Sequence, residues 1–155
     1  MNTLIFSVLN GAAIVATAVV FGTDVFFSVV GKKAAAKSKD ESISDLMGHF
    51  HEVADVRMPM FGFTSIITTF LQVVVAGLQT VQGQLAFLAL MSLLTHLLIY
   101  LAVSKPVNKI MVDAVKFGRM INNIRELQQR WDKVISLRAV LLLIAMACLV
   151  LVNYC

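Results

Sequence analysis

Three ionisable residues interrupt apolar runs that are long enough to cross a membrane. They are Asp24, His96 and Arg138. A charged side chain inside a span costs at least ~2.5 kcal/mol on insertion scales, so such groups usually face the interior of a helix bundle and pair. Each of the three lies five to seven residues from the polar end of its run, which is roughly 8–10 Å along a helix. We therefore expect all three in one polar layer of the bundle.

The chemistry of this layer allows two interpretations. In the structural one, Asp24 and Arg138 form an ion pair and His96 is hydrogen-bonded to it, because buried charges normally pair. In the functional one, the layer is a polar pocket that binds a proton, an anion or a polar group of a ligand. Arg138 could also extend to the membrane surface, which would weaken both interpretations.

A second group of polar residues lies between the first and second apolar runs. On a helix, His51 and Asp55 share a face at i, i+4, and His49 and Glu52 share another at i, i+3. This group could form a ligand site. The alternative is a solvated helix with local ion pairs, His51 with Asp55 and Glu52 with Arg57.

Metal and cofactor binding have weak support in the sequence. Imidazole and carboxylate groups at these spacings can bind transition metals, and haem could take His51 or His96 as an axial ligand. However, the chain lacks the pair of Glu-x-x-His elements that di-iron bundles have. Cys148 and Cys155 have neither a metal-site nor a disulfide spacing. We predict no metal and no cofactor, with haem and a transition metal as alternatives.

The elements that must position these residues are membrane-spanning helices. Hydrophobic residues make up 59% of the 155 residues and charged residues 14%, whereas soluble domains have about 45–50% and about 25%. A span needs about 20 mostly apolar residues. The sequence therefore predicts one all-α domain, residues 1–155, which is an integral membrane four-helix bundle. Its spans are expected at 3–30, 58–80, 85–103 and 134–152, with amphipathic helical segments at 31–57 and 104–133.

Several local signals mark the expected helix ends. Ser42 or Ser44 could cap the helix of the first amphipathic segment. Pro106 suits the first turn of the helix in the second segment. Asn122 and Asn123 could break that helix before the last span begins.

The basic residues fix an expected orientation. Twelve of the thirteen lie in the two long connections, and both connections must be on one side of the membrane: Lys32, Lys33, Lys37, Lys39, Arg57, Lys105, Lys109, Lys116, Arg119, Arg125, Arg130 and Lys133. The positive-inside rule makes that side the cytoplasm. Both termini and the turn expected at Val81–Gln84 then lie outside, and we expect a bacterial inner membrane. The net charge of +4 therefore indicates membrane orientation and no nucleic-acid partner.

The polar layer makes the expected bundle asymmetric. The cytoplasmic half holds the ionisable residues, and the outer half should be almost wholly apolar. The expected partners are the lipid bilayer and a lipophilic small molecule. A second copy of the chain is a further candidate, because the first span has small residues that permit close helix contact: Gly11, Ala12, Ala13, Ala16 and Ala18.

The order of short motifs along the chain resembles a known family. Phe21–Phe27 reads FGTDVFF, and His51–Pro59 reads HEVADVRMP. Pro106-Val107-Asn108 follows the third span, and Trp131 precedes Arg138 at the entry to the fourth. This arrangement resembles the anthrone oxygenase-like family of small four-span membrane proteins over nearly the whole chain.

The resemblance implies a function and a set of positions. Some members resemble oxygenases that convert anthrones to anthraquinones without a bound cofactor. The family positions would be His51, Asp55, Arg57, Asn108, Trp131 and Arg138. Asp24 and His96 enter as candidates from the physical argument alone.

Three functions are compatible with these observations. In the first, an oxygenase or oxidoreductase acts on a lipophilic aromatic substrate: His51 or His96 removes a proton, Arg138 stabilises the enolate by its charge, and oxygen reacts with the carbanion. Asp55 and Arg57 belong to this catalytic set, and Asp24, Asn108 and Trp131 would bind the substrate. The second is a small transporter or channel-like protein built around Asp24. The third is a haem-, metal- or lipid-binding subunit without catalysis.

Overall fold

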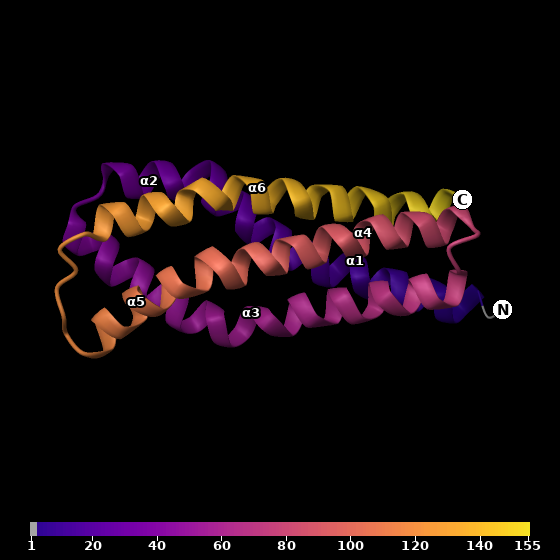
Figure 1. Ribbon diagram of the computed structural model, residues 1–155, viewed down its shortest axis with the longest axis horizontal. Coiled ribbons are helices and arrows are strands. Elements are labelled where there is room, and N and C mark those ends of the chain that lie inside the picture. The colour runs from indigo at the N-terminus through magenta and orange to yellow at the C-terminus, as the bar shows by residue number, and fades with distance from the viewer. Residues whose placement is uncertain (1–2) are drawn as a thin grey trace.

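The computed structural model describes residues 3–155, and its regular elements are all helices (Figure 1). The predicted all-α four-helix bundle is confirmed. The α-helices are α1 (Thr3–Phe26), α2 (Lys32–Lys37), α3 (Asp40–Ala76), α4 (Val81–Ile99), α5 (Lys105–Lys116) and α6 (Ile124–Leu151). Two π-helical segments, Phe27–Gly31 and Tyr100–Ser104, join α1 to α2 and α4 to α5, and a 3-10 turn, Val152–Tyr154, follows α6.

Four long helical rods result, and each is apolar enough to cross a membrane. They cover Leu4–Lys37, Asp40–Ala76, Val81–Lys116 and Ile124–Tyr154. Large apolar side chains such as Leu4, Val56 and Leu98 are exposed on the outside of the bundle, where lipid tails can solvate them. The chain is a multi-pass membrane protein.

The rods extend beyond the hydrocarbon region. They have 31 to 37 residues, which is roughly 46–56 Å, whereas the apolar core of a bilayer is about 30 Å thick. The two amphipathic segments are therefore mostly continuations of the spans. Where α3 begins, the structure departs from the expected cap: Lys39 is the N-cap residue and no side chain caps it. Asp40 and Glu41 lie in the first turn instead, where their charge favours the helix dipole.

The bundle has two distinct ends, which Figure 1 separates along its long axis. Both described chain ends and the α3–α4 turn lie at one, called here the terminal end. The α2–α3 and α5–α6 connections lie at the other, called here the loop end. α5 ends at Lys116, earlier than the break predicted at Asn122 and Asn123, whereas α6 begins directly after Asn123.

The α3–α4 turn lies earlier in the chain than predicted. It occupies the residues between Ala76 and Val81, and the predicted turn Val81–Gln84 is the first turn of α4. Gly77 has a positive φ of 73°, which favours glycine. The Thr80 hydroxyl caps α4 by accepting a hydrogen bond from the Gly83 N–H at 3.1 Å. A Cβ at Gly83 would lie 2.0 Å from the Gly77 carbonyl oxygen, so Gly83 allows the turn to close.

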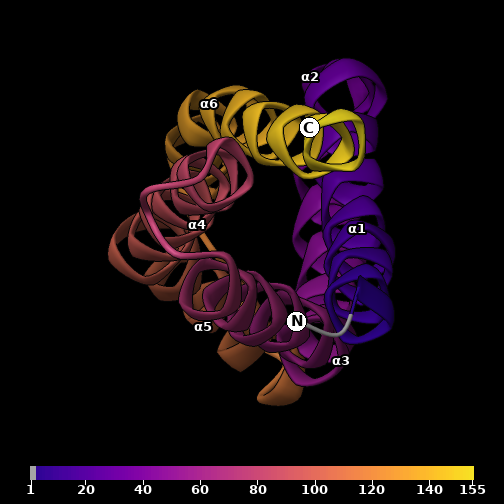
Figure 2. The ribbon, with the colours of Figure 1, turned by 90° about the vertical axis from the view of Figure 1, so that its right-hand side faces the viewer.

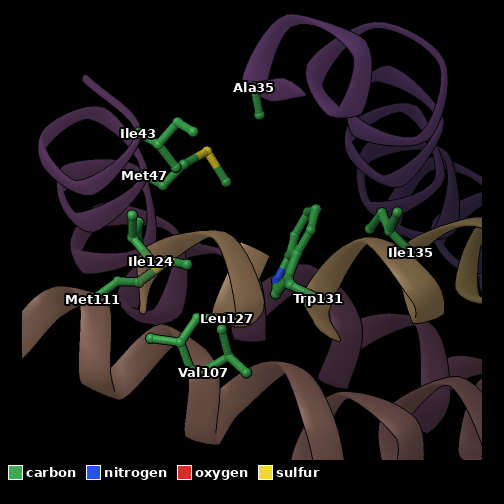
Figure 3. Close-up of a cluster of buried hydrophobic side chains, with 9 residues drawn as sticks. All are labelled: Ala35, Ile43, Met47, Val107, Met111, Ile124, Leu127, Trp131 and Ile135. Atoms are coloured by element: carbon green, nitrogen blue, oxygen red, sulfur yellow. The ribbon is translucent and has the colours of Figure 1, made fainter. Parts of the chain in front are cut away.

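The four rods pack in a ring. α1 contacts α3 and α6, and α4 contacts the same two helices (Figure 2). The buried apolar residues form two clusters. One lies in the terminal half and includes Ala13, Ala89 and Leu142. The other lies at the loop end, where residues of α2, α3, α5 and α6 meet around the indole of Trp131 (Figure 3).

Candidate functional site

The helices are irregular where they surround the ionisable residues. The π-helical segment Phe27–Gly31 begins three residues after Asp24, and Tyr100–Ser104 begins four residues after His96. In α3, Pro59 has no N–H, so the carbonyl of Asp55 loses its partner within the helix. Single π turns are frequent at functional sites of helical proteins. These departures set the directions in which the flanking side chains enter the bundle.

The predicted polar layer is present as a hydrogen-bonded cluster. Arg138 donates from one terminal nitrogen to Asp24 Oδ1 at 2.9 Å and from the other to Ser104 Oγ at 2.8 Å. His96 Nε2 lies 3.0 Å from Asp24 Oδ2. Asp24 is 3% exposed and Arg138 is 7% exposed. The arginine therefore does not extend to the membrane surface.

His96 occupies a position with two competing partners. Its Nε2 also lies 3.3 Å from Arg138 Nε. If Nε2 carries a proton, it donates to Asp24, and the Nε–H of Arg138 has no acceptor there. If Nε2 is unprotonated, it accepts from Arg138, and its contact with Asp24 Oδ2 contains no hydrogen. The ring can satisfy only one of these contacts at a time.

A second hydrogen-bonded group surrounds Asp55. Its Oδ1 accepts from the Tyr100 hydroxyl at 2.8 Å and from Asn108 Nδ2 at 2.9 Å. The alternative ion pair between His51 and Asp55 is wrong, because Asp55 turns toward the π-helical segment Tyr100–Ser104 and α5 instead. The guanidinium of Arg138 lies 5.5 Å from the centre of the Tyr100 ring, which brings the two groups together.

Three buried polar atoms near these groups have no hydrogen-bond partner within residues 3–155: His51 Nε2, Asn108 Oδ1 and Trp131 Nε1. His51 is 4% exposed, and its ring centre lies 5.6 Å from that of Trp131. A buried polar group left without a partner costs about 1–3 kcal/mol. A polar group of a bound molecule could supply the missing partners.

A cavity of about 260 Å³ lies between these residues. All four rods line it. Apart from Ser104, the polar side chains described above form its polar wall. Apolar and aromatic residues form most of the rest, among them Phe27, Phe50, Met58, Leu93, Leu97 and Leu142. Apolar walls with a few polar groups are typical of small-molecule sites, whose volumes are about 300–1,000 Å³. The cavity is slightly smaller than the lower limit of that range, so it suits a small ligand.

The structure separates the remaining candidates from this cavity. Arg57 is exposed on α3 and does not line it. Glu52 lies 3.4 Å from Lys116 and 3.5 Å from His49, so the predicted pair of Glu52 with Arg57 is wrong. In the described part of the chain, no three His, Cys, Asp or Glu side chains are grouped to hold a metal ion.

Tyr100 and Ser104 were not predicted as site residues. The prediction that the outer half, here the terminal half, is almost wholly apolar is wrong. That half contains buried polar residues on α1 and α3: Asn10, Thr17, Ser65, Thr69 and Gln72. The Thr17 and Ser65 hydroxyls are 2.6 Å apart. Their seven- and four-residue spacings were a usable signal, because such spacings place them on one helix face.

The fold and the site define a class: a four-span helical membrane protein with a mainly apolar cavity and a buried cluster of paired charges. Comparison of the chain with family models, with curated proteins and with solved structures finds no match. The resemblance to the anthrone oxygenase-like family therefore stays a prediction.

Proposed function

We propose that the cavity binds a lipophilic aromatic molecule with a carbonyl or hydroxyl group, and that the protein oxidises this molecule with molecular oxygen. The observation that carries the proposal is the set of partnerless polar atoms on cavity residues His51, Asn108 and Trp131. The indole N–H could donate to a carbonyl, and the amide oxygen could accept from a hydroxyl. The aromatic wall, with Phe27 and Phe50 in edge-to-face contact, suits a planar ring system.

His51 is the better of the two candidate bases. His96 is occupied by Asp24 and Arg138, whereas Nε2 of His51 has no partner in the described part of the chain. Arg138 is neutralised by Asp24, which weakens its action on an enolate. The indole N–H of Trp131 is the alternative donor, because it makes no hydrogen bond to any residue that the structure describes.

The proposed reaction needs no group beyond substrate and oxygen. His51 removes a proton from an activated CH₂ beside aromatic rings, and the resulting carbanion is stabilised as an enolate. The carbanion gives its electrons to oxygen, a C–O bond forms, and the proton returns to yield a hydroperoxide. Loss of water then leaves a carbonyl. The substrate CH₂ is oxidised to C=O, and O₂ supplies one oxygen atom to the product and one to water.

The test uses anthrone as the probe with purified protein in nanodiscs. Oxygen uptake and quinone absorbance should rise above the rate in empty nanodiscs. His51→Gln should remove this gain, and His49→Gln should retain it, because His49 is two residues away on the exposed face of α3. Oxidation no faster than in empty nanodiscs would exclude the catalytic part. Anthrone binding to the wild type but not to Trp131→Leu would then support ligand binding without catalysis.

A proton-coupled transporter is the second candidate, and one specific observation favours it. The two competing partners of His96 Nε2 mean that its protonation exchanges one contact of the Asp24–Arg138 cluster for another. Protonation could therefore change the wall of the cavity. Substrate flux driven by a proton gradient in liposomes, and lost in Asp24→Asn, would support this function over oxidation.

We further propose that the loop end faces the cytoplasm of a bacterium and that two copies can associate through α1. The supporting observations are the basic residues of the two connections and the exposed Gly11 and Ala18 on α1. Cys155 is exposed and Cys148 is buried, so a membrane-impermeant maleimide added to spheroplasts should label Cys155. If Cys155 is labelled only after lysis, the proposed orientation is wrong and the loop end faces outward. Cross-linking in intact membranes tests the association.

A further inference from the structure

The terminal half of the bundle contains buried polar groups that the proposed reaction does not use. Asn10 is 1% exposed, and Thr69 and Gln72 are each 0% exposed. Asn10 Oδ1, Thr69 Oγ1 and Gln72 Oε1 have no hydrogen-bond partner in residues 3–155. None of the three residues lines the cavity. They therefore form a separate polar set, whose partners are not among the described residues.

The helix register places these residues together. α1 and α3 are adjacent and run in opposite directions (Figure 1), and the contact between Thr17 and Ser65 fixes their alignment. Seven residues farther toward the terminal end, Asn10 on α1 and Gln72 on α3 reach the same level. Four residues farther, Thr69 lies between that level and Ser65. We call this row of residues on α1 and α3 the polar seam.

The unused atoms of the seam are complementary to water. Asn10 donates through its amide nitrogen to the Leu149 carbonyl at 3.1 Å and to Asn153 Oδ1 at 2.9 Å, so its oxygen is an acceptor without a donor. Gln72 Oε1 is a second such acceptor. Thr17, Thr23, Thr68 and Thr95 each donate to the carbonyl four residues back, but Thr69 does not. Water can donate to each amide oxygen and accept from this hydroxyl.

We propose that Asn10, Thr69 and Gln72 bind internal water, and that this water continues the cavity toward the terminal end of the bundle. The link between the two is the Thr17–Ser65 pair, because both residues line the cavity and both belong to the seam. Asp24 lies seven residues beyond Thr17 on the same face of α1. The seam thus gives the charged cluster a second approach for water, from the end opposite the basic connections.

Water-edited solid-state NMR in lipid bilayers tests the proposal directly, because it measures magnetisation transfer from mobile water to side-chain carbons. Thr69 and Gln72 should receive water magnetisation faster than Thr64, which lies on the exposed face of the same helix. The threonines provide a matched comparison within one sample. Thr69 signals that build up no faster than those of Thr64 would overturn the proposal.

Two substitutions separate hydration from mere packing. Thr69→Val keeps the shape of the side chain and removes the hydroxyl, so the Gln72 signal should fall to the rate of Thr64. Thr69→Ser keeps the hydroxyl and should retain the transfer. If Gln72 keeps its transfer rate in Thr69→Val, the threonine does not hold the water and the proposed site is wrong. If the melting temperatures of both variants equal that of the wild type, the fold is retained.

Discussion

The two halves of this bundle bury polar residues in different ways. The loop-end half buries full charges, Asp24 and Arg138, and satisfies them with each other and with Ser104. The terminal half buries neutral amides and hydroxyls instead of charges, and several of their atoms, like those of His51, Asn108 and Trp131 at the cavity, have no partner among residues 3–155. Charges in a low-dielectric interior must be paired within the protein, whereas neutral groups can be satisfied by single water molecules.

The two halves also hold their helices together by different contacts. Around the cavity, Asp24 and Arg138 have their partners on other helices, so the cluster fixes how α1, α4 and α6 meet. In the terminal half, small buried residues such as Ala13, Ala89 and Ala145 let the helices approach closely. Substitutions should therefore have large effects near the cavity and small effects in the seam.

The largest expected effect is the loss of Arg138. Arg138→Ala leaves Asp24 buried without a counter-charge, which costs about 3–5 kcal/mol of unfolding free energy. The double variant Asp24→Leu/Arg138→Met removes both charges and should recover most of that stability. Unfolding in mixed micelles measures both changes. Arg57→Ala is the control, because Arg57 is exposed. If Arg138→Ala is as stable as Arg57→Ala, the explanation by paired buried charges is wrong.

The next largest effect concerns the hydrogen-bonded group around Asp55 at the cavity. Tyr100→Phe removes the hydroxyl that donates to Asp55 at 2.8 Å. A hydrogen bond to a charged group contributes about 1.5–3 kcal/mol, so the variant should unfold more easily by that amount. Tyr154→Phe is the matched control, because Tyr154 is exposed. Equal stability of the two variants would mean that Asp55 is satisfied in another way.

The sequence was sufficient to predict the charged cluster, because an ionisable residue in an apolar run is rare and costly. The rise per residue then placed Asp24, His96 and Arg138 at one depth. Tyr100 and Ser104 carried no such signal, since aromatic and hydroxyl residues are common in spans. The i, i+4 spacing of His51 and Asp55 gave their shared face but not their partners, which depend on how α4 and α5 lie beside α3.

The helix boundaries show a similar limit. The turn between α3 and α4 was predicted at Gly83, whereas Gly77 is the residue with positive φ. Both glycines are needed, one for its backbone conformation and one for close approach, and sequence alone does not assign these two roles. The π-helical segments carry no local signal that distinguishes them from ordinary helix. They depend on the packing of whole rods, which no window of the sequence contains.

Two glycines at opposite ends of the bundle allow a comparison of how tightly each end is packed. A Cβ at Gly83 would lie 2.0 Å from the Gly77 carbonyl oxygen, and a Cβ at Gly48 would lie 2.1 Å from Val115 Cγ2. The first clash is with backbone and the second is mainly with a side chain. Gly83→Ala should therefore cost the greater part of the about 1–3 kcal/mol typical of overpacking, and Gly48→Ala less. Thermal melting that ranks Gly48→Ala as the more damaging variant would contradict this assignment.

The smallest expected effect concerns the hydrogen bond between Thr17 and Ser65 in the polar seam, and its size depends on which of the two residues is changed. Thr17 donates its one hydroxyl proton to the Ala13 carbonyl at 2.7 Å, so the 2.6 Å contact with Ser65 requires Ser65 to be the donor. Thr17→Val leaves the Ser65 hydroxyl without its acceptor, whereas Ser65→Ala leaves Thr17 still bonded. Interhelical hydrogen bonds in membranes contribute about 0.6 kcal/mol on average. Thr17→Val should therefore be the more destabilising of the two in micelle unfolding, and the reverse order would show that water or another group can replace this bond.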